Sequence, residues 1–153
     1  MEDFTKEGFK HVGKIMEWKE WINTVPTNIG VYAIINKGIV LKSQPFKEKS
    51  PVLFYNKKPL SYSTEKLKKA WETSNHQVLY IGKAEGKLGL KKRISNLMKF
   101  GEGENTPHRA GRSIWQIENC KEFNIYYCVC DNPEDKKNLL IQEYNPFANK
   151  QKN

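Results

Sequence analysis

The chain has 153 residues, of which 26 are Lys or Arg and 17 are Asp or Glu, so its formal net charge at pH 7 is +9. This length predicts one domain over residues 1–153, and the positive charge favours polyanionic partners such as nucleic acids. No apolar run reaches the roughly 20 residues that span a bilayer, and Met1-Glu2-Asp3 lacks a signal-peptide pattern. We therefore expect a cytoplasmic protein with no membrane partner.

The first half of the chain predicts helices that alternate with short strands. Apolar residues at 3.6-type spacing predict an amphipathic helix over residues 14–24, which Pro26 closes. Runs of β-branched and aromatic residues predict strands over residues 30–35 and 51–55. A capping hydroxyl and spaced apolar residues predict a further helix over residues 64–74.

The second half continues the same alternation. We expect strands over residues 78–82 and 123–130, and a basic amphipathic helix over residues 90–100. Residues 107–116 read as a loop that enters a helix ending near residue 120. This order of elements predicts an α/β (α+β) fold in which a small, mainly antiparallel sheet is flanked by helices.

The three cysteines point to core thiols. Cys128 and Cys130 alternate within an apolar run that reads as a strand, and Cys120 leaves the total odd. Reduced thiols are the favoured interpretation. A zinc site made by these cysteines with His108 is the alternative, although the chain has no C-x-x-C pair.

Two short strand motifs carry the functional information. Gly30-Val31-Tyr32 and Tyr80-Ile81-Gly82 bring a tyrosine each, and Lys83, Arg93 and the closing Pro146-Phe147-Ala148-Asn149 follow in order. Over residues 28–149 this pattern resembles the GIY-YIG nuclease family. The resemblance implies a small central sheet flanked by helices. It also implies a DNA endonuclease that hydrolyses phosphodiester bonds of duplex DNA with Mg²⁺ or Mn²⁺. The long insertion and the single domain favour a restriction-like enzyme, with a stand-alone GIY-YIG domain protein as the alternative. Without the later residues, simple packing would explain the tyrosines, because Tyr is a good strand former.

By this resemblance, six residues are candidates for catalysis. Tyr32 or Tyr80 would take the proton from an attacking water, with the phenol perturbed by Lys83 or the metal, and which tyrosine acts stays open. Arg93 would hold two phosphate oxygens with its planar fork of donors. Asn149 would brace the site. The sixth, His108, is a candidate phosphate contact or proton shuttle, with a helix cap or a surface role as its alternative.

The stretch containing His108 is similar to a His-Arg-Gly-Gly-Arg stretch that precedes Ile-Trp-Gln in related sequences. Ala110 departs from that spelling, and Leu97 stands where the family commonly has a tyrosine or histidine. We expect Trp115 to lie in the core. Candidate DNA contacts are Lys91, Lys92, Arg109 and Arg112.

A long insertion separates the two motif strands. It covers about residues 37–77, whereas compact members of the family join these strands by a tight hairpin. Its many lysines would bind DNA phosphates beside the site and so fix the register of the duplex. The alternative is that the insertion is a solvated addition at one edge of the fold.

The late helix departs from the family at its metal ligand. The family's pattern resembles Glu-x-x-Leu-Ile before Pro-Phe-Ala-Asn, and here Lys137 stands at the glutamate position. A lysine cannot replace an oxygen ligand of Mg²⁺. Glu134, one helical turn earlier, is a candidate substitute, whereas Glu143 projects elsewhere. Otherwise the ligand has been lost, by natural divergence or by an inactivating change.

Two functions therefore remain. The first is a metal-dependent endonuclease, inactive in this chain if Lys137 has removed the metal ligand. The alternative is a non-cleaving nucleic-acid-binding protein on the same scaffold. The sequence leaves open the target site, the choice between monomer and homodimer, and recognition of RNA in place of DNA.

Overall fold

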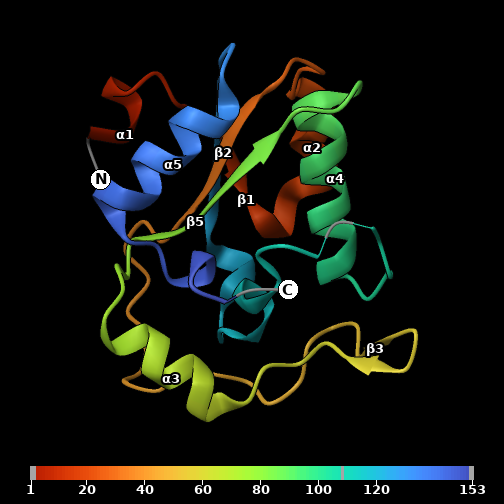
Figure 1. Ribbon diagram of the computed structural model, residues 1–153, viewed down its shortest axis with the longest axis vertical. Helices are drawn as coiled ribbons and strands as arrows, with labels where there is room; N and C mark the ends of the chain where they lie inside the picture. The colour runs from red at the N-terminus through yellow and green to blue at the C-terminus, as the bar shows by residue number, and fades with distance from the viewer. Residues whose placement is uncertain (1–2, 108, 152–153) are drawn as a thin grey trace.

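Within residues 3–107 and 109–151, which the computed structural model describes, four strands form an antiparallel sheet in the order β1-β6-β2-β5. A separate pair, β3 and β4, forms a small second sheet, and helices flank the main one (Figure 1). The expected mixed α/β class with an antiparallel sheet is confirmed. The strands of the main sheet are β1 (Lys10–Lys14), β2 (Gly30–Ile35), β5 (Val78–Ala84) and β6 (Asn124–Val129).

The two motif strands are neighbours in the sheet. β2 pairs antiparallel with β5, and Tyr32 lies opposite Gly82 while Ile34 lies opposite Tyr80. β6 pairs with the other edge of β2, so β2 is central and β5 is an edge strand. Every residue of β2 is buried, because both faces of the sheet are covered.

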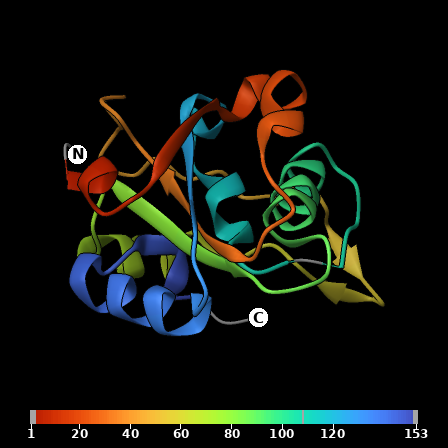
Figure 2. The same ribbon diagram turned by 90° about the horizontal axis from the view of Figure 1, so that it is seen from above.

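Helices cover the two faces differently. α4 (Gly89–Gly101) packs on one face, while α5 (Pro133–Tyr144) and the short α1 (Asp3–Lys6) pack on the other. Figure 2 shows the sheet running between α5 and α4. Tyr32 and Tyr80 belong to the core on the α4 side, whereas Val31 and Ile81 belong to the core on the α5 side.

The N-terminal segment does not form the single helix expected over residues 14–24. β1 ends at Lys14, and the helical part is broken into η1 (Ile15–Glu17), α2 (Trp18–Trp21) and η2 (Ile22–Thr24). The indole of Trp21 folds back to donate a hydrogen bond to the Lys14 carbonyl at 2.8 Å. β1 pairs with β6, which is distant in sequence, so local periodicity gave no sign of it.

The insertion consists of a hairpin and one helix. β3 (Phe54–Tyr55) and β4 (Lys58–Pro59) replace the longer strand expected over residues 51–55, and α3 (Thr64–Glu72) has Ser63 as its N-cap, as expected. In Figure 1 these elements lie below the main sheet. The Trp71 ring of α3 packs edge-on against Phe147, with ring centroids 5.1 Å apart. The insertion is thus packed against the C-terminal motif.

The stretch after α4 is more irregular than predicted. Instead of one helix it contains the 3-10 turns η3 (Arg112–Gln116) and η4 (Cys120–Glu122), because Gly111 and Asn119 adopt left-handed backbone conformations before them. Trp115 is buried, as expected. A last 3-10 turn, η5 (Phe147–Asn149), carries the C-terminal motif. All three cysteines are free thiols. Among the described residues, no helix has the length and apolar composition needed to cross a membrane.

Candidate functional site

The antiparallel pairing of β2 and β5 brings the two motif tyrosines together. Their ring centroids lie 6.0 Å apart, with the ring planes tilted by 61°. Gly82 makes room for this arrangement, because a Cβ at that position would lie only 2.4 Å from Cζ of Tyr32. The glycine of the second motif is therefore explained by packing against the tyrosine of the first.

The two phenols are hydrogen-bonded to each other. Burial raises the pKa of Tyr32 well above its ordinary value, and the hydrogen bond raises it further. Burial also raises the pKa of Tyr80, to about 12, although the bond from Tyr32 and the charge of Arg93 act to lower it. Both phenols are therefore neutral at pH 7.

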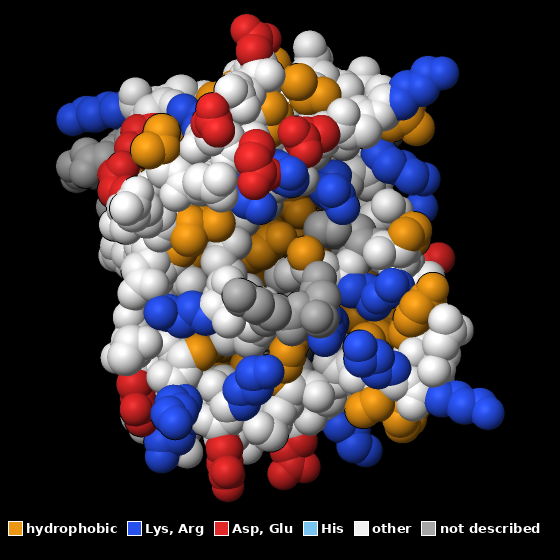
Figure 3. All heavy atoms as spheres, in the orientation of Figure 1, with side chains coloured by type: hydrophobic (Ala, Val, Ile, Leu, Met, Phe, Trp, Pro, Cys, Tyr) orange, Lys and Arg blue, Asp and Glu red, His pale blue; other side chains and the backbone are white. Residues whose placement is uncertain are grey.

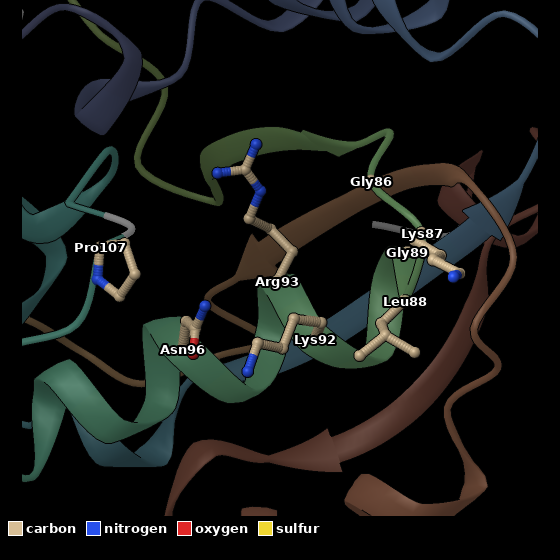
Figure 4. A pocket seen from close by; sticks show the side chains of 8 residues that line it. All are labelled: Gly86, Lys87, Leu88, Gly89, Lys92, Arg93, Asn96 and Pro107. Atoms are coloured by element: carbon tan, nitrogen blue, oxygen red, sulfur yellow. The ribbon is translucent and has the colours of Figure 1, made fainter.

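Arg93 is the cation whose charge acts on the pKa of both phenols. It lies on α4 and is half-buried, and its charge lowers the pKa of each tyrosine. Figure 4 shows its side chain extending from α4 towards β5, while Lys92 points away from that strand. A surface hollow of about 340 Å³ lies beside it, lined by Gly86, Lys87, Leu88, Gly89, Lys92, Arg93, Asn96 and Pro107. Three of these residues are cations and none is an acid.

The loop at residues 109–112 packs against Tyr80. Gly111 is left-handed, and a Cβ there would lie 2.8 Å from the Tyr80 ring, so the backbone packs directly on that ring. Two of the candidate DNA contacts lie on this loop, and both are engaged with the insertion. The Arg112 guanidinium is buried, stacks over Tyr62 and donates to the Leu60 carbonyl at 3.0 Å.

Arg109 is half-buried and stacks over the ring of Tyr55, with its guanidinium carbon 3.7 Å from the ring centroid. Arg112 therefore has a structural role, whereas Arg109 keeps part of its surface exposed. Lys91 is half-buried and Lys92 exposed on α4. His108 lies outside the described residues.

Asn149 braces the second motif strand at its free edge. Its Oδ1 accepts the Ile81 backbone N–H and its Nδ2 donates to the Ile81 carbonyl, both at 2.8 Å. The amide thus imitates a neighbouring strand at a point between Tyr80 and Gly82. Because an edge strand otherwise leaves these groups unpaired, the C-terminal motif fixes β5 where the tyrosine stands.

Lys83 lies on the opposite side of β5 from the tyrosines. Its ammonium group pairs with Glu85 at 2.8 Å and closely with Glu134 of α5. The Lys83 ammonium lowers the pKa of the Glu134 carboxyl, and the charge of Lys137 lowers it further. The cation that acts on the phenols is Arg93, and Lys83 is engaged with carboxylates instead.

These residues do not fit a divalent metal ion. Glu134 is bonded to Lys83 and has Lys137 nearby on the same helix, so any cation there would meet two ammonium groups. Glu143, the other acid on the late helix, lies beside Glu7 and Tyr144 near α1. Across the described residues, no three His, Cys, Asp or Glu side chains gather as a possible metal site. The carboxylate donors that Mg²⁺ requires are therefore not assembled.

Comparison with protein-family models, with curated proteins and with solved structures gave no match.

Sequence reasoning missed the residue that ties the insertion to the site. Gln116 is fully buried, accepts from the Tyr62 N–H at 2.8 Å and donates to the carbonyls of Tyr62 and Lys47 at 2.9 and 3.0 Å. A polar residue directly after Ile114 and Trp115 in a buried turn was the available signal. Its partners lie far away in the sequence, so local patterns do not reveal them.

Proposed function

We propose that this chain binds DNA through a phosphodiester site of the GIY-YIG nuclease type, in which Lys137 replaces the carboxylate that would hold the metal. The observation that carries the proposal is the hydrogen-bonded pair of Tyr32 and Tyr80 with Arg93 beside it. Plain packing needs no buried phenol paired to a second phenol, and it needs no arginine facing both.

The chemistry of these groups suits a phosphate ligand. Neutral phenols are hydrogen-bond donors, and an arginine fork presents two donors to two phosphate oxygens. Arg93 is half-buried at the edge of a hollow that opens to the surface, so its charge is felt more strongly than that of an exposed lysine. Tyr80 is 5% exposed and does not line this hollow, so Arg93 is the member of the set that a phosphate at the hollow would meet first.

The surface around the site carries the matching charge. Figure 3 shows Lys and Arg side chains at the upper rim of a hollow on the face seen in Figure 1, with Asp and Glu side chains directly above them, and further Lys and Arg side chains towards the lower right, where β3 lies. Together with a net charge of +9, this distribution favours a polyanion on this face.

A second candidate function is hydrolysis of DNA by this chain itself, with Mg²⁺ or Mn²⁺. The intact tyrosine pair and Arg93 favour it, because they are the parts of the site that would handle the proton and the phosphate. The pairing of Glu134 with Lys83 opposes it, since the remaining acid is already neutralised. We therefore place DNA binding first and hydrolysis second.

Binding of a labelled DNA duplex, followed by fluorescence anisotropy at several salt concentrations, tests the proposal. Arg93→Ala is expected to weaken binding roughly tenfold and to lower the salt slope by about one. The affinity of Arg93→Lys is expected to lie between those of the parent and Arg93→Ala, because lysine keeps the charge and loses the planar fork of donors. Lys99→Ala, on the same helix, is the matched control and is expected to bind almost as the parent does.

Two results would contradict the proposal. One is a parent chain that is folded and yet does not bind duplex DNA at low salt. The other is equal loss of affinity in Arg93→Ala and Lys99→Ala, which would mean diffuse attraction without a site. Circular dichroism of each variant establishes that it is folded.

A further inference from the structure

The insertion carries, before α3, a protruding hairpin whose apolar side chains face water. This tip hairpin, residues 53–60, comprises β3, β4 and the turn between them, and it is closed by a hydrogen bond of 2.9 Å from the Leu60 N–H to the Leu53 carbonyl. Phe54 is 60% exposed, and Leu53 and Tyr55 are also exposed. Three neighbouring exposed hydrophobic residues at a protruding tip are a costly arrangement unless a partner covers them.

The turn of the tip hairpin holds a lysine in an unfavourable conformation. Asn56 and Lys57 have φ values of 48° and 66°, which is the pattern of a type I′ turn. Glycine is the preferred residue at the second of these positions, and a lysine there carries a steric penalty. Local strain of this kind is typical of segments that make functional contacts.

The tip hairpin is held in place by two arginines. Arg109 stacks on Tyr55, and Arg112 donates to the Leu60 carbonyl. Between them lies a hollow of about 310 Å³, lined by Tyr55, Asn56, Lys58, Leu60, Arg109 and Arg112. This lining contains three cations and no acid, and two of the cations, Lys58 and Arg109, keep exposed surface, so the hollow is complementary to phosphate.

The same loop joins the tip hairpin to the tyrosine site. Arg109 and Arg112 lie on either side of Gly111, whose backbone packs on the Tyr80 ring. Pro107, on the same loop, lines the hollow beside Arg93. Figure 2 shows the β3–β4 hairpin on the side of the molecule where α4 lies. The two basic hollows are thus linked through one loop.

We propose that the tip hairpin is a second DNA contact, which places Phe54 against the groove of the duplex while Lys57 and Lys58 meet the phosphates. This inference rests on the proposed function and adds to it the part of the duplex flanking the Arg93 site. Apolar wedges beside basic side chains are a known way to engage a duplex groove. The mixture of exposed aromatic and cationic groups, without acids in the hollow, favours DNA over an apolar protein partner.

Three variants in the same anisotropy assay test this inference. Phe54→Ala is expected to weaken duplex binding roughly tenfold, as loss of an aromatic contact to nucleic acid does. Val40→Ala is the matched control, because Val40 is 93% exposed elsewhere in the insertion, and it is expected to bind as the parent does.

Lys57→Gly gives a result that a merely structural role cannot give. Glycine relieves the left-handed lysine, so the Tm is expected to rise, while DNA affinity falls about threefold and the salt slope falls by about one. A rise in Tm with unchanged affinity would overturn the role of this lysine.

The outcomes separate this inference from the proposed function. If Arg93→Ala weakens binding and both Phe54→Ala and Lys57→Gly bind as the parent does, the tip hairpin is no DNA contact while the proposed function stands. If the parent does not bind duplex DNA, both fall. If Phe54→Ala leaves DNA affinity unchanged and abolishes self-association in sedimentation, the tip joins copies of this chain, and the inference is overturned.

Discussion

The two faces of strand β5 handle charge in opposite ways. On the α4 face, Tyr80 is buried, hydrogen-bonded to Tyr32 and influenced by Arg93. On the α5 face, Lys83 and Glu134 form an ion pair on the outside of the sheet, with side chains that are 29% and 44% exposed. The first face holds two hydrogen-bonded phenols under the influence of an arginine, whereas on the second a carboxylate is paired with a lysine.

This difference separates phosphate binding from metal binding. In a metal-dependent nuclease both would be needed, the donors for the phosphate and a carboxylate for the cation. Here the tyrosines and Arg93 lie together, whereas Glu134, the candidate metal ligand, is paired with Lys83. Lys137 stands where the resemblance places the metal ligand, and we therefore propose that this one substitution leaves a chain that binds DNA without cutting it.

The largest expected effect concerns the buried phenol. The folded pKa of Tyr80 is about 12, above its ordinary value of 10.0. Its contribution to stability is therefore fully present below pH 10 and is lost as the pH rises towards 12. Two pKa units correspond to roughly 3 kcal/mol. Chemical denaturation is expected to show the stability advantage of the parent over Tyr80→Phe shrinking by most of this amount between pH 10 and 12.

Below pH 10 the difference between these two proteins is expected to stay constant, which provides an internal control. A difference that does not change up to pH 12 would mean that Tyr80 is not buried as described. It would remove the contrast between the two faces.

A smaller effect is expected from filling the space over Gly82. Gly82→Ala would place a Cβ within 2.4 Å of the Tyr32 ring, which must move and separate from Tyr80. Overpacking of this kind costs about 2 kcal/mol. Gly86→Ala, four residues later, meets nothing within 4 Å and is expected to be neutral. Equal stability of the two variants in urea would contradict the tight fit between the motifs.

The smallest effect is expected on the α5 face. Because Lys83 lowers the pKa of Glu134, the stability from this pair is present above the ordinary carboxyl pKa of 4.5 and is lost as the pH falls through the lowered value. The Tm of Glu134→Gln should lie slightly below that of the parent at neutral pH. The two should converge in acid and in high salt. A Tm difference between the parent and Glu134→Gln that widens in acid would contradict a stabilising pair of Lys83 and Glu134.

Much of the fold follows from the sequence because its elements have strong local patterns. The strands around Tyr32 and Tyr80 are continuous apolar runs, and α4 has a clear apolar stripe, so both were predictable. β1 was missed because it is mostly polar, with Lys10 and Lys14 at its ends, and exists through its pairing with β6.

The site was predictable only in part, for a similar reason. The order of motifs identified Tyr32, Tyr80 and Arg93, and the structure brings these three together. The bond from Asn149 to the Ile81 backbone and the pairing of Lys83 with Glu134 depend on residues distant in sequence. Such contacts follow from the tertiary fold, and no spacing within the chain reports them.

We propose that this chain keeps the donors of a nuclease-type site and lacks the metal ligand because of Lys137. The most direct measurement is cleavage of supercoiled plasmid DNA with Mg²⁺ or Mn²⁺ by this chain, by Lys137→Glu and by Lys137→Gln, all verified as folded. We expect Lys137→Glu alone to cut the plasmid, and we expect that cutting to be lost when Arg93→Ala is added. Cutting by the unchanged chain, or no cutting by a folded Lys137→Glu that still binds DNA, would contradict this proposal.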